Sequence, residues 1–423
     1  MLMQGARQTG KTYLLQEFGR REYETVIYCN FEETSGLDQL FSQDLNPDRI
    51  LADLSLFLGH PIRPQKDLLI FDEIQISNSA LNSLKYFCEK RNDIHIAAAG
   101  SLLGIKLSQP GSFPVGKVNY LHLYPMTFLE YLEAVGEQRY VQLIDSAKKP
   151  IPFNALFHEH LIDLLRQYFV VGGMPEAVQQ YIETKNVSET RRIQNEIIKS
   201  YVLDFVKHAP SAEVSKLFLI WDSIPGHLAR ENKKFIFSAL KKGARGKTYE
   251  NAIVWLEDAG LIHRVHAVAK AEHPLKFYAD RSCFKVYALD IGLLGAMAGL
   301  PVELMVQGKQ LFNELQGALT ENYATQQLVA HCEKPLFYWR SKGGRAELDF
   351  LIEGDTQVYP LEVKAGINPK SKSLTSYDSQ FNPQTLIRTN LLNLKQNGKI
   401  LNLPLYAVSK LNRINYFTTR PYL

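Results

Sequence analysis

A glycine-rich octapeptide near the start of the chain constrains the fold more than any other feature of the sequence. It fits the spacing G-x-x-x-x-G-K-[ST] of a phosphate-binding P-loop and consists of Gly5, Ala6, Arg7, Gln8, Thr9, Gly10, Lys11 and Thr12. The glycines allow a tight turn whose backbone N–H groups face phosphate oxygens. Lys11 would reach the β- and γ-phosphates, and Thr12 would offer its hydroxyl to Mg²⁺. The pattern therefore predicts a strand, a loop and a helix that bind ATP and Mg²⁺.

Short apolar segments after the loop predict the strands of a parallel sheet. They cover residues 25–31, 67–73, 93–99 and 118–123, and stretches of helical pattern separate them. Strands that alternate with helices form a parallel sheet with helices on both faces. We therefore expect a doubly wound α/β domain over residues 1–145. Only four residues precede the loop, so the first strand is expected to be truncated and to lack the residues on the adenine side.

Polar residues at the ends of two of these segments are the candidates for ATP hydrolysis. Asp72 and Glu73 close an apolar strand, where an aspartate holds Mg²⁺ through water and the next glutamate orients the attacking water. Ser101 stands where such ATPases carry a polar residue that senses the γ-phosphate, with a helix N-cap as the alternative. Arg7 and Lys117 are cations that either steady phosphate charge or remain solvated.

The middle of the chain predicts a helical subdomain followed by a winged helix. Residues 126–222 have a helical pattern almost throughout, and we place the subdomain at 146–224. Basic helices, a helix at 249–259 and a strand at 261–268 then follow, so the winged helix is expected at 225–300. Residues 225–285 hold 12 Lys and Arg against 6 Asp and Glu, which suits DNA as a partner. A solvated basic surface without a partner is the alternative.

Charged residues on a predicted hairpin suggest a second site in the last part of the chain. Strand alternation places Asp349 on one face of the strand at 347–353, beside Glu362 and Lys364 on the strand at 357–364. This order fits a PD-(D/E)XK nuclease, with Asp349 and Glu362 holding Mg²⁺, Lys364 as a catalytic residue and Glu321 on the preceding helix as a further ligand. The alternative is the solvent face of an amphipathic hairpin.

Five motifs together make the chain resemble the prokaryotic AAA-type, STAND-related ATPases with a C-terminal domain of unknown function. They are the octapeptide, Asp72 to Gln75, Gly100-Ser101, Leu123 to Phe128 and Gly172 to Glu176. The resemblance implies an ATPase core, a winged helix and a restriction-endonuclease-like α/β domain, expected here at 301–423. It also implies that Gly173-Met174-Pro175 touches the base, so Pro175 is a candidate nucleotide contact. A helix start at Pro175 is the alternative reading.

The sequence therefore predicts an α/β protein that acts as an ATP-dependent switch on DNA. An ATP-regulated nuclease and a signalling or scaffold ATPase are the alternatives, and a homo-oligomer whose neighbouring subunit closes the nucleotide site is left open. No apolar run approaches the roughly 18 residues that span a bilayer, so we expect no membrane partner. We expect a cytoplasmic location. The four cysteines form no C-x-x-C pair, so no zinc site is indicated.

Overall fold

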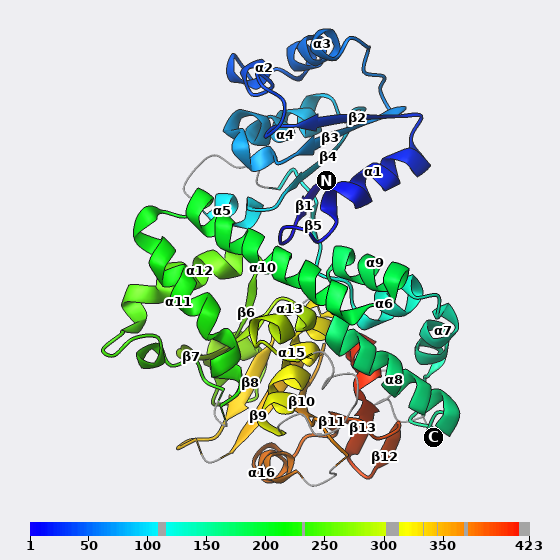
Figure 1. The fold of residues 1–423 in the computed structure, drawn as a ribbon, viewed down its shortest axis with the longest axis vertical. Helices are drawn as coiled ribbons and strands as arrows, with labels where there is room; N and C mark the ends of the chain where they lie inside the picture. Colours follow the sequence, from blue (N-terminus) through cyan, green and yellow to red (C-terminus); the bar gives the residue numbers. More distant parts are fainter. Residues whose placement is uncertain are drawn as a thin grey trace. The chain divides into compact units, whose positions relative to one another are not determined.

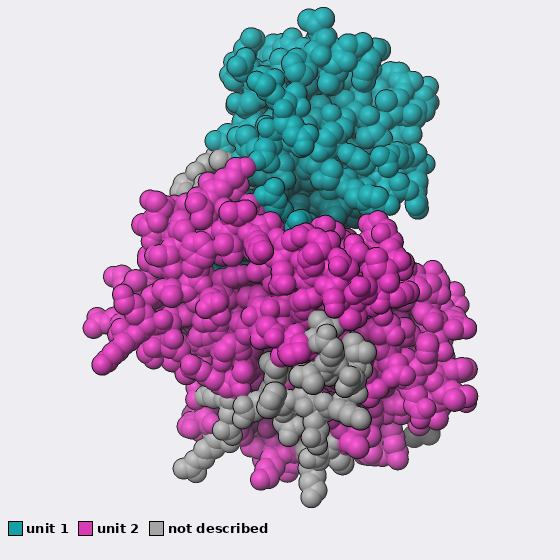
Figure 2. All heavy atoms as spheres, viewed as in Figure 1, with its two compact units in different colours: residues 1–124, 254–261 teal, residues 125–253, 262–423 magenta. Residues whose placement is uncertain are grey.

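A computed structural model describes residues 1–108, 116–230, 233–301, 313–332, 334–344, 346–367 and 371–413. The chain forms two compact units (Figure 2). Unit 1 comprises Met1–Tyr124 and Val254–Leu261, and unit 2 comprises Pro125–Ile253 and Ile262–Leu423. No helix in the described ranges is both long and apolar enough to cross a membrane.

Unit 1 is built on a parallel sheet that, in the described residues, has the strand order β2-β3-β4-β1-β5 (Figure 1). Its strands are β1 (Leu2–Gln4), β2 (Thr25–Asn30), β3 (Asp67–Asp72), β4 (His95–Gly100) and β5 (Tyr120–His122). Its helices are α1 (Lys11–Glu22), α2 (Gln39–Ser42), α3 (Pro47–Leu58), α4 (Asn78–Lys90) and α5 (Leu103–Ser108). The predicted parallel sheet is confirmed, and the carboxyl ends of its strands meet at one edge.

Two apolar layers enclose this sheet because alternate residues of each strand face opposite sides. Leu69 and Phe71 pack into one layer with α3 and α4, while Leu68 and Ile70 pack into the other with Leu15 of α1. All six residues of β3 are buried. This burial on both faces explains why the strand reads as an unbroken apolar run.

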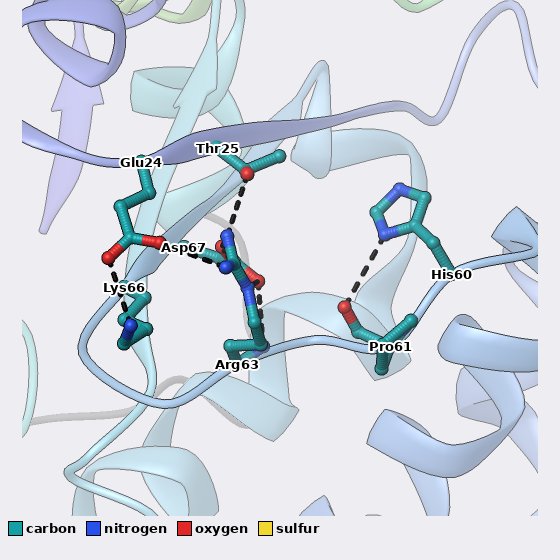
Figure 3. A network of polar contacts seen from close by, with 7 residues as sticks. All are labelled: Glu24, Thr25, His60, Pro61, Arg63, Lys66 and Asp67. Atoms are coloured by element: carbon teal, nitrogen blue, oxygen red, sulfur yellow. Dashed lines mark hydrogen bonds and ion pairs between the residues drawn. The ribbon is translucent and has the colours of Figure 1, made fainter.

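Arg63 links the amino ends of β2 and β3 through hydrogen bonds to Thr25 and Asp67 (Figure 3). These strand ends lie at the edge of the sheet opposite the P-loop. Its guanidinium donates to Asp67 Oδ1 at 2.6 Å and to Thr25 Oγ1 at 2.8 Å, and it pairs with Glu24 at 2.9 Å. The Arg63 backbone N–H also donates to Asp67 Oδ2 at 2.7 Å. Burial opposes ionisation of Asp67, but the bonds from Arg63 outweigh it and lower the pKa of this carboxyl group.

Unit 2 begins with a run of helices, as expected from the sequence. They are α6 (Phe128–Ala134), α7 (Gln138–Ser146), α8 (Ala155–Val171), α9 (Pro175–Thr184), α10 (Val187–His208) and α11 (Ser211–Leu228). Helix α12 (Gly246–Asp258) starts in unit 2 and ends in unit 1. The later helices are α13 (Ile291–Met297), α15 (Asn313–His331) and α16 (Lys372–Phe381).

A mixed sheet of eight strands in the described residues forms the rest of unit 2. Its order is β12-β13-β11-β10-β9-β8-β6-β7. The strands are β6 (Ile262–Val268), β7 (Ala279–Ala288), β8 (Phe337–Arg340), β9 (Glu347–Glu353), β10 (Val358–Val363), β11 (Leu386–Asn390), β12 (Lys395–Asn397) and β13 (Ile400–Pro404). The predicted hairpin corresponds to β9 and β10, which pair antiparallel with Leu361 opposite Phe350.

The domain boundaries expected from the sequence differ from the units in the structure. The hairpin assigned to a winged helix is β6 and β7, and β6 pairs in parallel with β8, so both strands extend the sheet that was expected to begin after residue 300. Unit 1 ends at Tyr124 rather than 145, and takes in residues 254–261. The basic helix expected before residue 249 is only a 3-10 turn, η2 (Phe237–Ala239). Pairing between distant strands leaves no local sequence signal, so it was missed.

Candidate functional site

The P-loop lies between β1 and α1, and its glycines are required by the backbone. Gly10 has φ 93° at the first turn of α1, a conformation that side chains with a Cβ rarely adopt. Gly5 lies so close to the backbone segment after β5 that a Cβ atom on it would be 2.2 Å from the carbonyl oxygen of Leu123. The loop is therefore held against the end of β5, with the N-terminus of α1 directly behind it.

Lys11 is buried within the loop and held by its carbonyl groups. Its Nζ donates to the carbonyl oxygens of Gly5 at 2.9 Å and Ala6 at 2.6 Å, and the side chain is 6% exposed. Burial lowers the pKa of Lys11 to about 8, although Glu73 and Asp72 act in the opposite direction. A buried cation of this kind gains most from an anionic partner, so its placement suits a phosphate group.

One carboxylate oxygen of Asp72 accepts hydrogen bonds from two hydroxyl groups. Thr12 Oγ1 donates to Asp72 Oδ2 at 2.6 Å, and the Tyr28 hydroxyl donates to it at 2.8 Å. The carboxylate is buried, and its Oδ1 accepts the Glu73 backbone N–H at 3.0 Å. These hard oxygen donors fit the role expected of Thr12 and Asp72, since Mg²⁺ is held by few protein oxygens together with substrate phosphates and water.

Glu73 has a strained backbone and a restrained side chain. Its φ of 50° lies in the left-handed region. Gln75 Nε2 donates to Glu73 Oε2 at 2.5 Å, and Ser101 Oγ donates to the same oxygen at 3.2 Å. A Cβ atom on Gly100 would come within 1.9 Å of Gln75 Oε1, so a larger residue there would displace the Gln75 amide. The structure therefore brings Glu73 and Ser101 together at the carboxyl ends of β3 and β4.

Sequence reasoning missed Tyr28 and Gln75 as members of this site. Tyr28 lies on β2, and Asn30 of this strand pairs with Asp72 in the sheet register. The sequence therefore offered a signal for Tyr28, because it comes near the carboxyl end of the strand that pairs with β3. The two cations considered beside the phosphates lie differently. Lys117 pairs with Glu89 at 3.6 Å, and Arg7 is half-buried within the loop itself.

Pro175 belongs to unit 2, where it is the first residue of α9. The residues before it are packed inside that unit: Gly173 N–H donates to Asp290 Oδ2 at 2.6 Å, and its carbonyl accepts the Met126 N–H at 2.7 Å. Proline at a first helical position is favoured because the missing N–H is not needed there. The role of Pro175 in binding a base stays a prediction.

The four candidates of the C-terminal site gather in one cluster inside unit 2. The Asp349 carboxyl group accepts the Val363 N–H of β10 at 2.8 Å and hydrogen-bonds Glu321 on α15, and both carboxyl groups act on the Lys364 ammonium. Lys364 Nζ pairs with Glu362 Oε1 at 2.8 Å. Glu321 and Glu362 are almost fully buried, whereas the Lys364 side chain is 38% exposed.

Two lysines that the sequence reasoning did not include neutralise the carboxylates of this cluster. Lys233 pairs with Glu321, and the buried Lys285 lies 2.6 Å from Glu347 Oε1 and 3.7 Å from Glu321 Oε2. Burial opposes ionisation of Glu321, but Lys233 and Lys285 outweigh it and lower its pKa. Burial and the neighbouring Glu321 raise the pKa of Asp349 to about 8, so this carboxyl group is protonated at neutral pH.

Several features of this cluster oppose binding of a divalent metal. Within the described residues, no three His, Cys, Asp or Glu side chains are placed to hold a metal ion. Glu362 retains one buried oxygen, Oε2, that has no hydrogen-bond partner in the part of the chain that the structure describes. Of the predicted ligands, Glu321 is neutralised by lysine and Asp349 by a proton. Metal ligation by Glu321, Asp349 and Glu362 stays a prediction.

Three family models match successive parts of the sequence. Residues 1–132 match an AAA domain, residues 162–304 match a domain of unknown function (DUF8612), and residues 316–407 match a second domain of unknown function (DUF4143). No curated protein matches the chain. Of the last two matches, one ends at residue 304 and the other begins at residue 316, although one sheet contains strands from both regions.

Solved structures with similarity to the chain include a Walker-type ATPase, a RuvB variant and Cdc6p. A Walker-type ATPase of Pyrococcus abyssi is 13% identical, with 70% of this chain and 90% of that chain covered and a TM-score of 0.42. A RuvB variant of Thermotoga maritima is 18% identical over 62% and 81%, with a TM-score of 0.28. Cdc6p of Pyrobaculum aerophilum is 11% identical over 73% and 87%, with a TM-score of 0.23.

The match to the AAA domain covers the P-loop, Asp72, Glu73 and Ser101, which the parallel sheet brings to one edge. Residues 1–132 are therefore similar to AAA domains, with a P-loop at the carboxyl edge of a parallel sheet.

Proposed function

We propose that this protein binds and hydrolyses ATP and acts as a nucleotide-dependent switch associated with DNA. The observation that carries the proposal is the convergence of Lys11, Thr12, Asp72, Glu73 and Ser101 in unit 1. A phosphate-binding loop, an Mg²⁺-binding oxygen pair and a carboxylate that can orient water are the parts that P-loop hydrolysis needs. ATP with Mg²⁺ is the ligand that matches all three.

Each residue has a distinct task in this proposal. Lys11 would exchange its bonds to the loop carbonyls for phosphate oxygens, which compensates a charge that is now buried. Thr12 and Asp72 would hold Mg²⁺, whose chemistry is to neutralise the charge that develops on the phosphate oxygens. Glu73 would orient the attacking water once its carboxylate is released from Gln75 and Ser101.

The contact between Ser101 and Glu73 supports the switch. Ser101 donates its hydroxyl to Glu73 in the structure, and a γ-phosphate oxygen would be a competing acceptor for the same hydroxyl. Occupation of the site by ATP would therefore change the hydrogen bonds of Glu73, and hydrolysis would restore them. Two discrete arrangements of the same side chains are what a nucleotide-dependent switch requires.

An exposed basic turn in unit 2 supports DNA as the partner. Lys241, Lys242, Arg245 and Lys247 lie within seven residues at the start of α12, and all four are exposed. Clustered cations on a surface bind the phosphate backbone without regard to sequence, and such binding weakens steeply with salt. A homo-oligomer whose neighbouring subunit would complete the ATP site is compatible with this proposal.

An ATP-regulated, Mg²⁺-dependent nuclease is a second candidate. The gathering of Asp349, Glu362, Lys364 and Glu321 and the unpartnered oxygen of Glu362 favour it. The lysine pairs of Glu321 oppose it, so we derive no metal-dependent step. A signalling ATPase whose C-terminal region binds protein is the remaining alternative.

The test measures ATP turnover by the full chain with and without single-stranded, duplex and branched DNA. Stimulation by DNA is expected for wild type, and it should be lost when Lys241, Lys242, Arg245 and Lys247 are all replaced by alanine. Replacement of Lys395 and Lys399, basic residues of unit 2 on and beside β12, provides the control. If no DNA changes the rate of ATP turnover, the signalling ATPase is favoured. Strand cleavage that EDTA abolishes would favour the nuclease. A chain that neither binds nor hydrolyses ATP would overturn the proposal.

A further inference from the structure

The end of β5 places two aromatic rings beside the P-loop. Gln4, the last residue of β1, pairs with His122, and the next N–H, that of Leu123, donates to the Gln4 carbonyl at 2.8 Å. The P-loop starts at Gly5, whose backbone touches the Leu123 carbonyl. His122 and Tyr124 therefore flank the first residue of the phosphate-binding loop, within unit 1.

The two rings form a continuous aromatic surface. As alternate residues of an extended segment, His122 and Tyr124 point to the same side. Their ring centroids are 4.4 Å apart, with 31° between the planes, so the two rings are in contact and tilted against each other. His122 is exposed and Tyr124 is half-buried at the open edge of the sheet, where all three residues of β5 are exposed.

We infer that His122 and Tyr124 form the stacking platform for the base of the nucleotide whose phosphates occupy the P-loop. The inference rests on the proposed ATP binding and adds the site of the base, for which the sequence offered only Pro175. An aromatic surface next to the loop suits a purine ring, because a flat π-system stacks on it without needing a specific hydrogen bond.

The charge of the site favours the base over a further phosphate at this position. The surrounding protein atoms desolvate the imidazole of His122 although part of its surface is exposed, and this desolvation and then the nearby Lys11 ammonium lower the pKa of His122, which favours the neutral ring. A neutral imidazole lacks the positive charge that makes histidine a phosphate ligand, but it keeps its flat ring. Phosphate oxygens are instead provided for by Lys11 and the loop backbone.

The test compares two ligands that differ in the base. ATP and inorganic tripolyphosphate, each with Mg²⁺, are titrated by calorimetry into the full wild-type chain and into His122→Ala, Tyr124→Ala and the double variant. Loss of stacking should lower the affinity of the double variant for ATP by about ten- to a hundredfold. Tripolyphosphate should bind all variants as it binds wild type, which also shows that the loop remains folded.

Two further variants separate stacking from other roles. Tyr124→Phe keeps the ring and should retain ATP affinity. Tyr120→Ala is the matched control, because Tyr120 is 48% exposed on the same strand but pairs with Leu2, away from the P-loop. If the variants lose the same affinity for ATP and for tripolyphosphate, or lose affinity for neither, the platform is overturned. Neither result would contradict ATP binding by the wild-type chain. A wild-type chain that binds neither ligand would overturn the proposed function itself, and the platform with it.

Discussion

The hydroxyl group of Tyr28 is expected to set how well the protein uses Mg²⁺. Tyr28 and Thr12 both donate to Asp72 Oδ2, so Tyr28 fixes the rotation of the carboxylate that is proposed to hold the metal with Thr12. Tyr28→Phe removes one hydrogen bond to a charged, buried acceptor and leaves the ring in place. Such bonds contribute about 1.5–3 kcal/mol, and since Tyr28 is half-buried we take the lower value.

If this energy serves to orient Asp72, the Mg²⁺ concentration that gives half-maximal ATP turnover should rise about tenfold. Turnover at saturating Mg²⁺ should change little, because neither Glu73 nor Ser101 contacts Tyr28 in the described structure. The assay is phosphate release against MgCl₂ at fixed ATP. Tyr13→Phe is the matched control, because Tyr13 on α1 is 70% exposed. Equal Mg²⁺ dependence of the two variants would refute the reasoning.

Further perturbations test the loop, the sheet clamp and the buried cluster. Lys11→Ala should abolish ATP binding in calorimetry, whereas Glu73→Gln should bind ATP and release phosphate slowly; wild-type turnover by Glu73→Gln would remove Glu73 from the mechanism. Asp67→Ala should lower the free energy of unfolding in urea by about 1–3 kcal/mol, because a backbone N–H and a guanidinium lose their buried acceptor; no loss would show that the clamp is not stabilising. The pKa of Asp349 is raised from its usual 3.8 to about 8, so its contribution to the free energy of unfolding is fully present below about pH 4 and is lost as the pH rises to 8; Asp349→Asn should flatten this decline between pH 4 and 8, and the exposed Asp355→Asn should not.

The sequence predicted unit 1 well because its signals are local. The P-loop, the carboxylate pair and the apolar strands each lie within a few consecutive residues, and the parallel sheet that they imply is present. The contacts that restrain Glu73 and Asp72 were not foreseen. The backbone of Glu73 is left-handed where Gln75 donates to its carboxylate, and no propensity predicts that conformation for a glutamate.

Unit 2 was harder to predict because its contacts join distant residues. The carboxylates on β9 and β10 could be placed on one face from strand alternation alone. The lysines that neutralise them come from residues 233 and 285, far outside the hairpin, so the charge of the cluster could not be read from the motif. The same limitation hid the pairing of β6 with β8.

Unit 1 is discontinuous in the sequence, and this limits how the protein can be divided into fragments. Residues 254–261 complete unit 1: a Cβ on Gly104 would lie 2.0 Å from the Asp258 carbonyl oxygen, and one on Gly260 would lie 3.3 Å from the Ala6 nitrogen. A fragment that stops at Tyr124 keeps every residue of the P-loop yet loses the backbone that covers Ala6. Truncation or grafting at the apparent end of the ATPase sequence would therefore separate the catalytic loop from part of its own packing, and a chimaera between relatives would have to carry the second half of α12 together with the loop.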